Sequence, residues 1–161
     1  MAIEQSQLNE RAIEAAGFLA KAMPRRLAGM RVGEQGGHCE IELDNPFESD
    51  RPVLISTAGG EVTVSFGECH THYDDLRGME DEATLVEQMV VKAILLTSGA
   101  EVSYSAWSGD RCLGCGWLRE GVDRRDGFGH FPEADRLKFV GWEPWGDAEL
   151  CRNRSDSPAG G

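Results

Sequence analysis

The fold is decided by residues 38–72, which read HCEIELDNPFESDRPVLISTAGGEVTVSFGECHTH. Three runs in this stretch, at 38–43, 52–57 and 61–72, are rich in β-branched residues or alternate between apolar and polar residues, as strands do. Gly59 and Gly60 separate the second run from the third, and glycine tolerates the positive φ that tight hairpins require. We therefore expect three consecutive strands, of which the last two form a hairpin.

Two segments with helical spacing flank these strands. Residues 6–23 repeat small and apolar side chains every three to four positions up to Pro24, which stops a helix. Residues 79–98 begin with acidic residues, which suit a helix N-terminus, continue with a wide apolar face and end before Gly99. Both segments are predicted to be helices that pack on the sheet.

The remaining sequence predicts three more strands, at 101–107, 112–119 and 136–142, with a polar, glycine-rich loop at 121–132. The sequence contains no repeat and no linker. Residues 1–150 are therefore predicted to form a single α+β domain: a mainly antiparallel β-sheet of five to six strands with two helices packed on one face. Residues 151–161 are small and polar, and we expect them to form a flexible C-terminal tail.

Composition restricts the class of protein. None of the 161 residues lies in an apolar run near the roughly 18 residues of a membrane span, and no signal peptide is visible. The five cysteines are an odd number without a secretion signal, which favours free thiols in a reducing compartment over a disulfide framework. We expect a soluble, cytoplasmic protein without a membrane partner, and its oligomeric state stays open.

Negative charge is concentrated in one stretch. The net charge is −12, and residues 68–87 hold seven acidic residues against one arginine. Such a surface repels nucleic acid and attracts a protein partner with a basic surface, although acidity also simply keeps proteins soluble. Trp142 and Trp145 are candidate aromatic anchors for a partner protein. The alternative is that they pack in the core of the protein. The acidic candidates for partner binding are Asp74, Asp75, Glu80, Asp81 and Glu82.

A metal site is an alternative to a purely binding role. If residues 61–72 form one strand, Glu68, His70 and His72 continue the apolar face that begins with Val62, Val64 and Phe66, because strand side chains alternate. One carboxylate and two imidazoles suit zinc or another divalent metal, which would activate water in a metal-dependent enzyme. The histidines equally suit local hydrogen bonds, and no cofactor is the default expectation.

The pair Cys112 and Cys115 has the C-x-x-C spacing of a zinc knuckle. Cys69 and His72 would complete such a site, but alternation places them on opposite faces of a strand. A redox role is disfavoured, because thioredoxin-like pairs sit at a helix N-terminus and these flanks predict strand. No Walker loop, GxGxxG, GxSxG or HExxH motif occurs, so we expect a binding protein rather than an enzyme.

Two segments carry a family resemblance, namely 61–75 (EVTVSFGECHTHYDD) and 141–147 (GWEPWGD). Together they resemble a group of small bacterial proteins in which a strand ends in His-Thr-His before an aromatic residue and an acid, with a tryptophan turn near the C-terminus. Some of that group are similar to immunity proteins of polymorphic toxin systems. The resemblance covers about residues 60–147 and implies a non-catalytic protein that blocks a basic toxin through its acidic surface.

The expected order of elements also resembles that of type III secretion chaperones. Those proteins are small and acidic, and they run helix, three strands, helix, two strands, helix. This second resemblance implies a homodimer that keeps a segment of a secreted effector extended.

Overall fold

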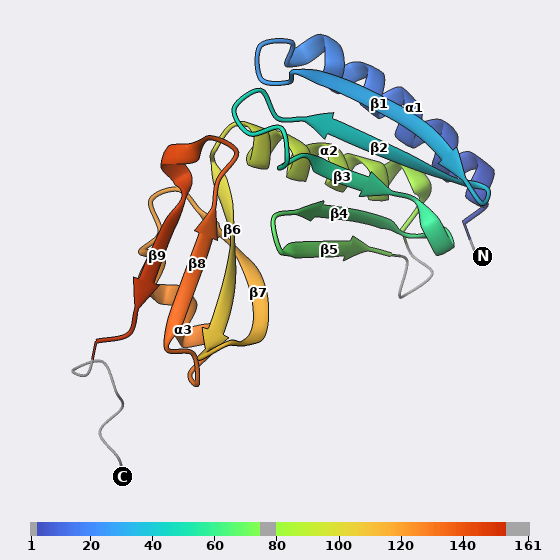
Figure 1. Ribbon diagram of the computed structural model, residues 1–161. Coiled ribbons are helices and arrows are strands. Elements are labelled where there is room, and N and C mark those ends of the chain that lie inside the picture. The colour runs from blue at the N-terminus through green and yellow to red at the C-terminus, as the bar shows by residue number, and fades with distance from the viewer. Residues whose placement is uncertain (1–2, 75–79, 154–161) are drawn as a thin grey trace.

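Two antiparallel sheets and three α-helices form the described part of the protein, residues 3–74 and 80–153 of a computed structural model (Figure 1). In chain order the elements are α1 (Gln5–Ala22), β1 (Gly29–Gln35), β2 (His38–Asp44), β3 (Val53–Ser56), η1 (Ala58–Gly60), β4 (Val62–Phe66), β5 (Cys69–Tyr73), α2 (Glu82–Thr97), β6 (Glu101–Ser108), β7 (Arg111–Arg119), η2 (Arg124–Asp126), α3 (Gly127–His130), β8 (Arg136–Val140), η3 (Pro144–Gly146) and β9 (Ala148–Cys151).

The first sheet has the strand order β1-β2-β3-β4-β5, and α1 and α2 cover one of its faces (Figure 1). Alternate strand residues such as Ile41, Ile55 and Val64 are buried beneath the helices, where they meet Leu8 and Met89. The expected hairpin at Gly59 and Gly60 joins β3 to β4. The predicted α+β class, with two helices on one face of an antiparallel sheet, is confirmed.

The second sheet has the order β7-β6-β8-β9 and a small core of its own, in which Tyr104, Leu137 and Phe139 pack against α3. The first sheet has the predicted number of strands, whereas the second sheet was not expected: the described residues contain nine strands in two sheets. Residues 29–35 were the main omission: they contain glycines and charges, and they become strand β1 by pairing with β2.

The predicted third strand is two strands. Gly67, at φ +61°, and Glu68 form a two-residue turn between β4 and β5, and Phe66 pairs directly with Cys69. Because a two-residue turn shifts the alternation by one position, odd-numbered residues face the core in β5 whereas even-numbered residues do so in β4. The expectation that His70 and His72 share a face with Val64 is thus wrong.

Trp142 joins the two sheets. Its side chain is fully buried against Phe66, with ring centroids 6.0 Å apart, and its indole Nε1 donates to the carbonyl of Arg26 at 3.0 Å. The side-chain amide of Asn45 donates to the carbonyl of Trp142 at 2.7 Å. Trp142, which follows β8, is therefore hydrogen-bonded both to the segment after α1 and to the segment after β2.

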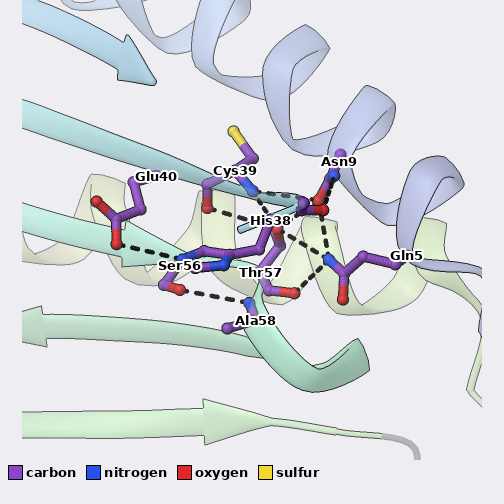
Figure 2. A network of polar contacts seen from close by, with 9 residues as sticks. Gln5, Asn9, His38, Cys39, Glu40, Ser56, Thr57 and Ala58 are labelled. Carbon is purple, nitrogen blue, oxygen red and sulfur yellow. Dashed lines mark hydrogen bonds and ion pairs between the residues drawn. The ribbon is translucent and has the colours of Figure 1, made fainter. Parts of the chain in front are cut away.

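A polar network fixes the start of α1 against the first sheet (Figure 2). Thr57, which is fully buried, donates from Oγ1 to Asn9 Oδ1 at 2.6 Å and accepts the backbone N–H of Cys39 at 2.9 Å. Gln5 donates from Nε2 to the same Asn9 oxygen at 2.9 Å, and Asn9 donates to the carbonyl of Gly37 at 2.9 Å. These directional bonds set the position of α1 along the strands, which apolar packing alone leaves loosely defined.

The first two residues of the predicted tail, Cys151 and Arg152, are hydrogen-bonded to the second sheet. Cys151 closes β9 by pairing with Arg136, and Arg152 donates from its backbone N–H to the carbonyl of Asp135 at 2.8 Å. The rest of the predicted tail, residues 154–161, lies outside the described residues. No helix within 3–74 or 80–153 is long and apolar enough to cross a membrane.

Candidate functional site

The acidic residues lie where β5 ends and α2 begins. Asp74 directly follows β5, Glu80 and Asp81 directly precede α2, and Glu82 is its first residue, whereas Asp75 lies outside the described residues. Glu87 follows one and a half turns later on the exposed side of the helix. We call Asp74, Glu80, Asp81, Glu82 and Glu87 the acidic end of α2.

Arg31 forms its ion pairs away from this acidic end. It lies on the open face of the first sheet, where it pairs with Glu42 and, at 3.1 Å, with Asp44. Among the described residues, no ion pair involves Asp74, Glu82 or Glu87. Their charges therefore remain available to a partner.

Asp81 is the N-cap of α2, and its carboxylate accepts the backbone N–H of Thr84 at 2.8 Å. The hydrogen bonds from Thr84 lower the pKa of Asp81 below its usual range. A lowered pKa in the folded state means that the ionised cap stabilises the protein above the ordinary aspartate pKa of about 3.9. That contribution disappears as the pH falls through the folded-state pKa.

We therefore expect the substitution Asp81→Ala to destabilise the protein at neutral pH and to make progressively less difference below about pH 4. Asp81→Asn is the matched control, because asparagine caps helices without a titrating charge. Urea unfolding of the three proteins at a series of pH values measures the differences. A wild-type advantage over Asp81→Ala that stayed constant down to about pH 2 would contradict the assignment of this carboxylate as an ionised cap.

The structure does not bring together Glu68, His70 and His72, the alternative metal site. Glu68 lies in the turn, and among the described residues no three His, Cys, Asp or Glu side chains come together as a metal would need. His72 Nδ1 lies 2.9 Å from both Glu61 Oε1 and Thr63 Oγ1, and its ring stacks edge-on with His70 at 4.9 Å between centroids. Local hydrogen bonding thus accounts for His72, and the strand-face argument for a metal no longer applies.

The two tryptophans of the WEPW segment differ in exposure. Trp142 has no exposed surface, so its assignment as an aromatic anchor is wrong. Trp145, in η3, is 72% exposed and packs edge-on against the half-exposed ring of Phe47 at 5.6 Å. Pro144 begins η3, and Trp145 directly follows it. Trp145 remains a candidate anchor.

A groove of about 430 Å³ runs beside α2, between this helix and the second sheet. Its helix wall is a stripe with helical spacing, and Glu87 joins it to the acidic end of α2. The floor and the opposite wall come from β5, β6 and β7. The lining residues are Tyr73, Thr84, Glu87, Gln88, Val91, Lys92, Leu95, Glu101 and Arg119.

A buried charge cluster closes the groove at its base. The ammonium of Lys92 pairs with the carboxylate of Glu101, and their side chains are only 12% and 6% exposed. Arg119 approaches the other Glu101 oxygen at 3.6 Å, and the Lys92 ammonium also lies 4.5 Å from the centroid of the Trp117 ring. The pair links α2 to β6 of the second sheet.

Tyr73 stands beside this cluster, and burial, together with the negative charge of Glu101, raises the pKa of its hydroxyl to about 12. Tyr73 therefore stays neutral and serves as a hydrogen-bonding, largely apolar wall at neutral pH. Clefts with perturbed titratable groups are frequent functional sites, which makes this groove the first candidate for ligand contact.

Most residues of the groove carry no signal in the sequence that would mark them as a site. One signal was present: Lys92 is the only charged residue between Gln88 and Thr97 in an otherwise apolar helix segment. A lone lysine on an apolar helix face requires a partner, because an unpaired buried charge is costly. The partner, Glu101, could not be named from sequence since the relation of α2 to β6 depends on the fold of the whole chain.

Comparison with protein-family models, with curated proteins and with solved structures gives no match. The resemblances to immunity proteins and to secretion chaperones therefore stay predictions. The observed element order, helix, five strands, helix, two strands, short helix and two strands, differs from the order expected for a secretion chaperone.

Proposed function

We propose that this protein is a non-catalytic binding protein, and that it captures a protein partner with a basic surface through the acidic end of α2. The observation that carries the proposal is the absence, among the described residues, of any ion pair to Asp74, Glu82 or Glu87. Asp75, between Asp74 and Glu82 in sequence, lies outside the described residues and carries no part of this argument.

The neighbouring groove adds apolar contact surface to the charges of the acidic end of α2. Val91 is half-exposed and Leu95 partly exposed on the helix wall, and Tyr73 lines the opposite side. Exposed carboxylates accelerate association and fix orientation, whereas apolar contacts contribute most of the lasting affinity. A partner with a lysine or arginine next to an apolar side chain fits this arrangement.

The sequence resemblance to immunity proteins supports a specific class of partner, a basic toxin whose surface the protein covers. Such inhibition depends on fast association, because a toxin must be captured before it acts. Electrostatic steering raises association rates by about 10- to 1,000-fold and weakens as salt is added. A strongly salt-dependent association rate is thus the expected behaviour of this interface.

We expect the charge-reversal variant Glu82→Lys/Glu87→Lys to bind the partner with an association rate at least about tenfold lower than the wild type in low salt. The partner is first recovered from lysate of the producing organism on the immobilised full chain in low salt. Its association and dissociation rates are then measured by surface plasmon resonance against wild type and variants, in low and high salt.

The matched control is Glu10→Lys/Glu34→Lys, which changes the net charge equally at exposed positions on α1 and β1. This control should alter the association rate by no more than about twofold. Equal losses in both double variants would show that net charge rather than the acidic end of α2 governs binding. Recovery of no basic partner in low salt would overturn the proposal itself.

A further inference from the structure

Two of the five free cysteines meet where the sheets touch. Cys69 begins β5 and is 3% exposed, and Cys115 lies in the middle of β7 and is partly exposed. The two thiols are neighbours, and Cys115 is one of the groups that raise the pKa of Cys69. They are 46 positions apart in sequence, so their proximity is a product of the tertiary structure.

Strand register explains this proximity. β5 and β7 are the edge strands of the two sheets, and they contact each other (Figure 1). The turn before Cys69 packs on the second sheet so closely that a Cβ on Gly67 would lie 2.8 Å from Ser103 Oγ. Ser103 and Ser105 share a face of β6, and Ser105 pairs with Cys115, so the Cys115 side chain projects toward that turn.

The C-x-x-C spacing is not the basis of this pair. Cys112 and Cys115 are three residues apart on an extended strand, which separates their Cα atoms by about 10 Å, whereas a disulfide requires less than about 7 Å. A bulge around Leu113 places Cys112 on the same face as Cys115 without closing that gap. The exposed Cys112 thiol instead approaches the carbonyl of Gly114 at 3.7 Å.

We propose that Cys69 and Cys115 are a redox modification site, at which a low-molecular-weight disulfide of the glutathione class oxidises the two thiols to a disulfide that cross-links the sheets. The partly exposed Cys115 reacts first. Its thiolate attacks one sulfur of the small disulfide and releases one thiolate, which leaves a mixed disulfide on Cys115.

Cys69 completes the reaction. Its thiol loses a proton and attacks the Cys115 sulfur, which expels the second small thiolate and forms the Cys69–Cys115 bond. The protein thus gives up two electrons and two protons, and the small disulfide is reduced to two thiols. Burial and the neighbouring Cys115 thiol raise the pKa of Cys69, so Cys69 stays protonated and is the slower, second thiol.

The test uses the full chain carrying Cys112→Ser and Cys151→Ser, which removes the two exposed thiols. After treatment with oxidised glutathione, we expect a Cys69–Cys115 cross-linked peptide in a non-reducing mass-spectrometric map. Under denaturing conditions one free thiol should remain, that of Cys39. We also expect a melting temperature about 10 °C above that of the reduced protein, because the cross-link restricts the unfolded chain.

Adding Cys115→Ser to this protein should abolish both the cross-link and the shift in melting temperature. A stable glutathione adduct on Cys115 without a cross-link would overturn the proposal, and so would three thiols that all remain free. In the wild-type chain, a Cys112–Cys115 cross-link would likewise overturn it. None of these outcomes depends on whether a basic partner binds.

Discussion

Replacement of Trp142 by alanine is expected to lower the free energy of unfolding by about 4 kcal/mol. The indole is fully buried, packs on Phe66 and donates to the carbonyl of Arg26 at 3.0 Å. Its removal leaves a large cavity at the junction of the sheets and takes the hydrogen-bond donor away from the carbonyl of Arg26, and both changes are costly. Urea unfolding followed by circular dichroism at several wavelengths measures the loss.

Trp145→Ala is the matched control, since the same residue type three positions later is 72% exposed. We expect this second substitution to cost less than about 1 kcal/mol. Similar losses for the two variants would contradict the assignment of Trp142 as the residue that joins the sheets. A smaller loss in partner affinity from Trp142→Ala than from Trp145→Ala is expected in the folded proteins, because only Trp145 is accessible.

The other large loss in the free energy of unfolding is expected from breaking the buried ion pair between Lys92 and Glu101. Lys92→Met should destabilise the protein by about 3 kcal/mol, because the carboxylate of Glu101 is then left buried with only the more distant Arg119. The double variant Lys92→Met/Glu101→Leu removes both charges and should recover most of the loss, since an apolar pair of similar size replaces the buried ions.

The exposed pair Arg11 and Glu14 on α1 provides the comparison for this experiment. Arg11→Met should change the free energy of unfolding by no more than about 0.5 kcal/mol, because water and salt screen exposed pairs. All variants are compared by chemical denaturation in one buffer. A double variant at least as unstable as Lys92→Met would argue against a buried, uncompensated Glu101 as the cause.

The helices were predictable because their signals are local. Apolar spacing places α1 and α2 within about three residues of their observed bounds, and Asp81 and Gly99 mark the ends of α2. Strands β6, β7 and β8 alternate in the same local way. By contrast, β1 carries no alternation, and its strand conformation follows from pairing with β2, which is a non-local contact.

The candidate site was harder to predict, because one missed turn reverses which alternate side chains of the following strand face the core. Treating 61–72 as one strand placed His70 and His72 on the buried side, whereas the turn at Gly67 turns them to the open face. Glu80, Asp81 and Glu82 were easier to place, since three consecutive acidic residues indicate a helix start and they lie at the start of α2. The groove and the Cys69–Cys115 contact required knowledge of how the two sheets meet.

The position of α1 has a consequence for folding during synthesis. This helix leaves the ribosome before β2 and α2, yet its buried side packs against both, and α2 ends 75 residues later. Translation adds about 5–20 residues per second, so the apolar side of α1 stays unpacked for roughly 4–15 s until α2 has been synthesised. During that interval the nascent chain exposes the apolar side of an amphipathic segment to chaperones. Slowing translation before α2 should therefore increase chaperone binding to the nascent chain.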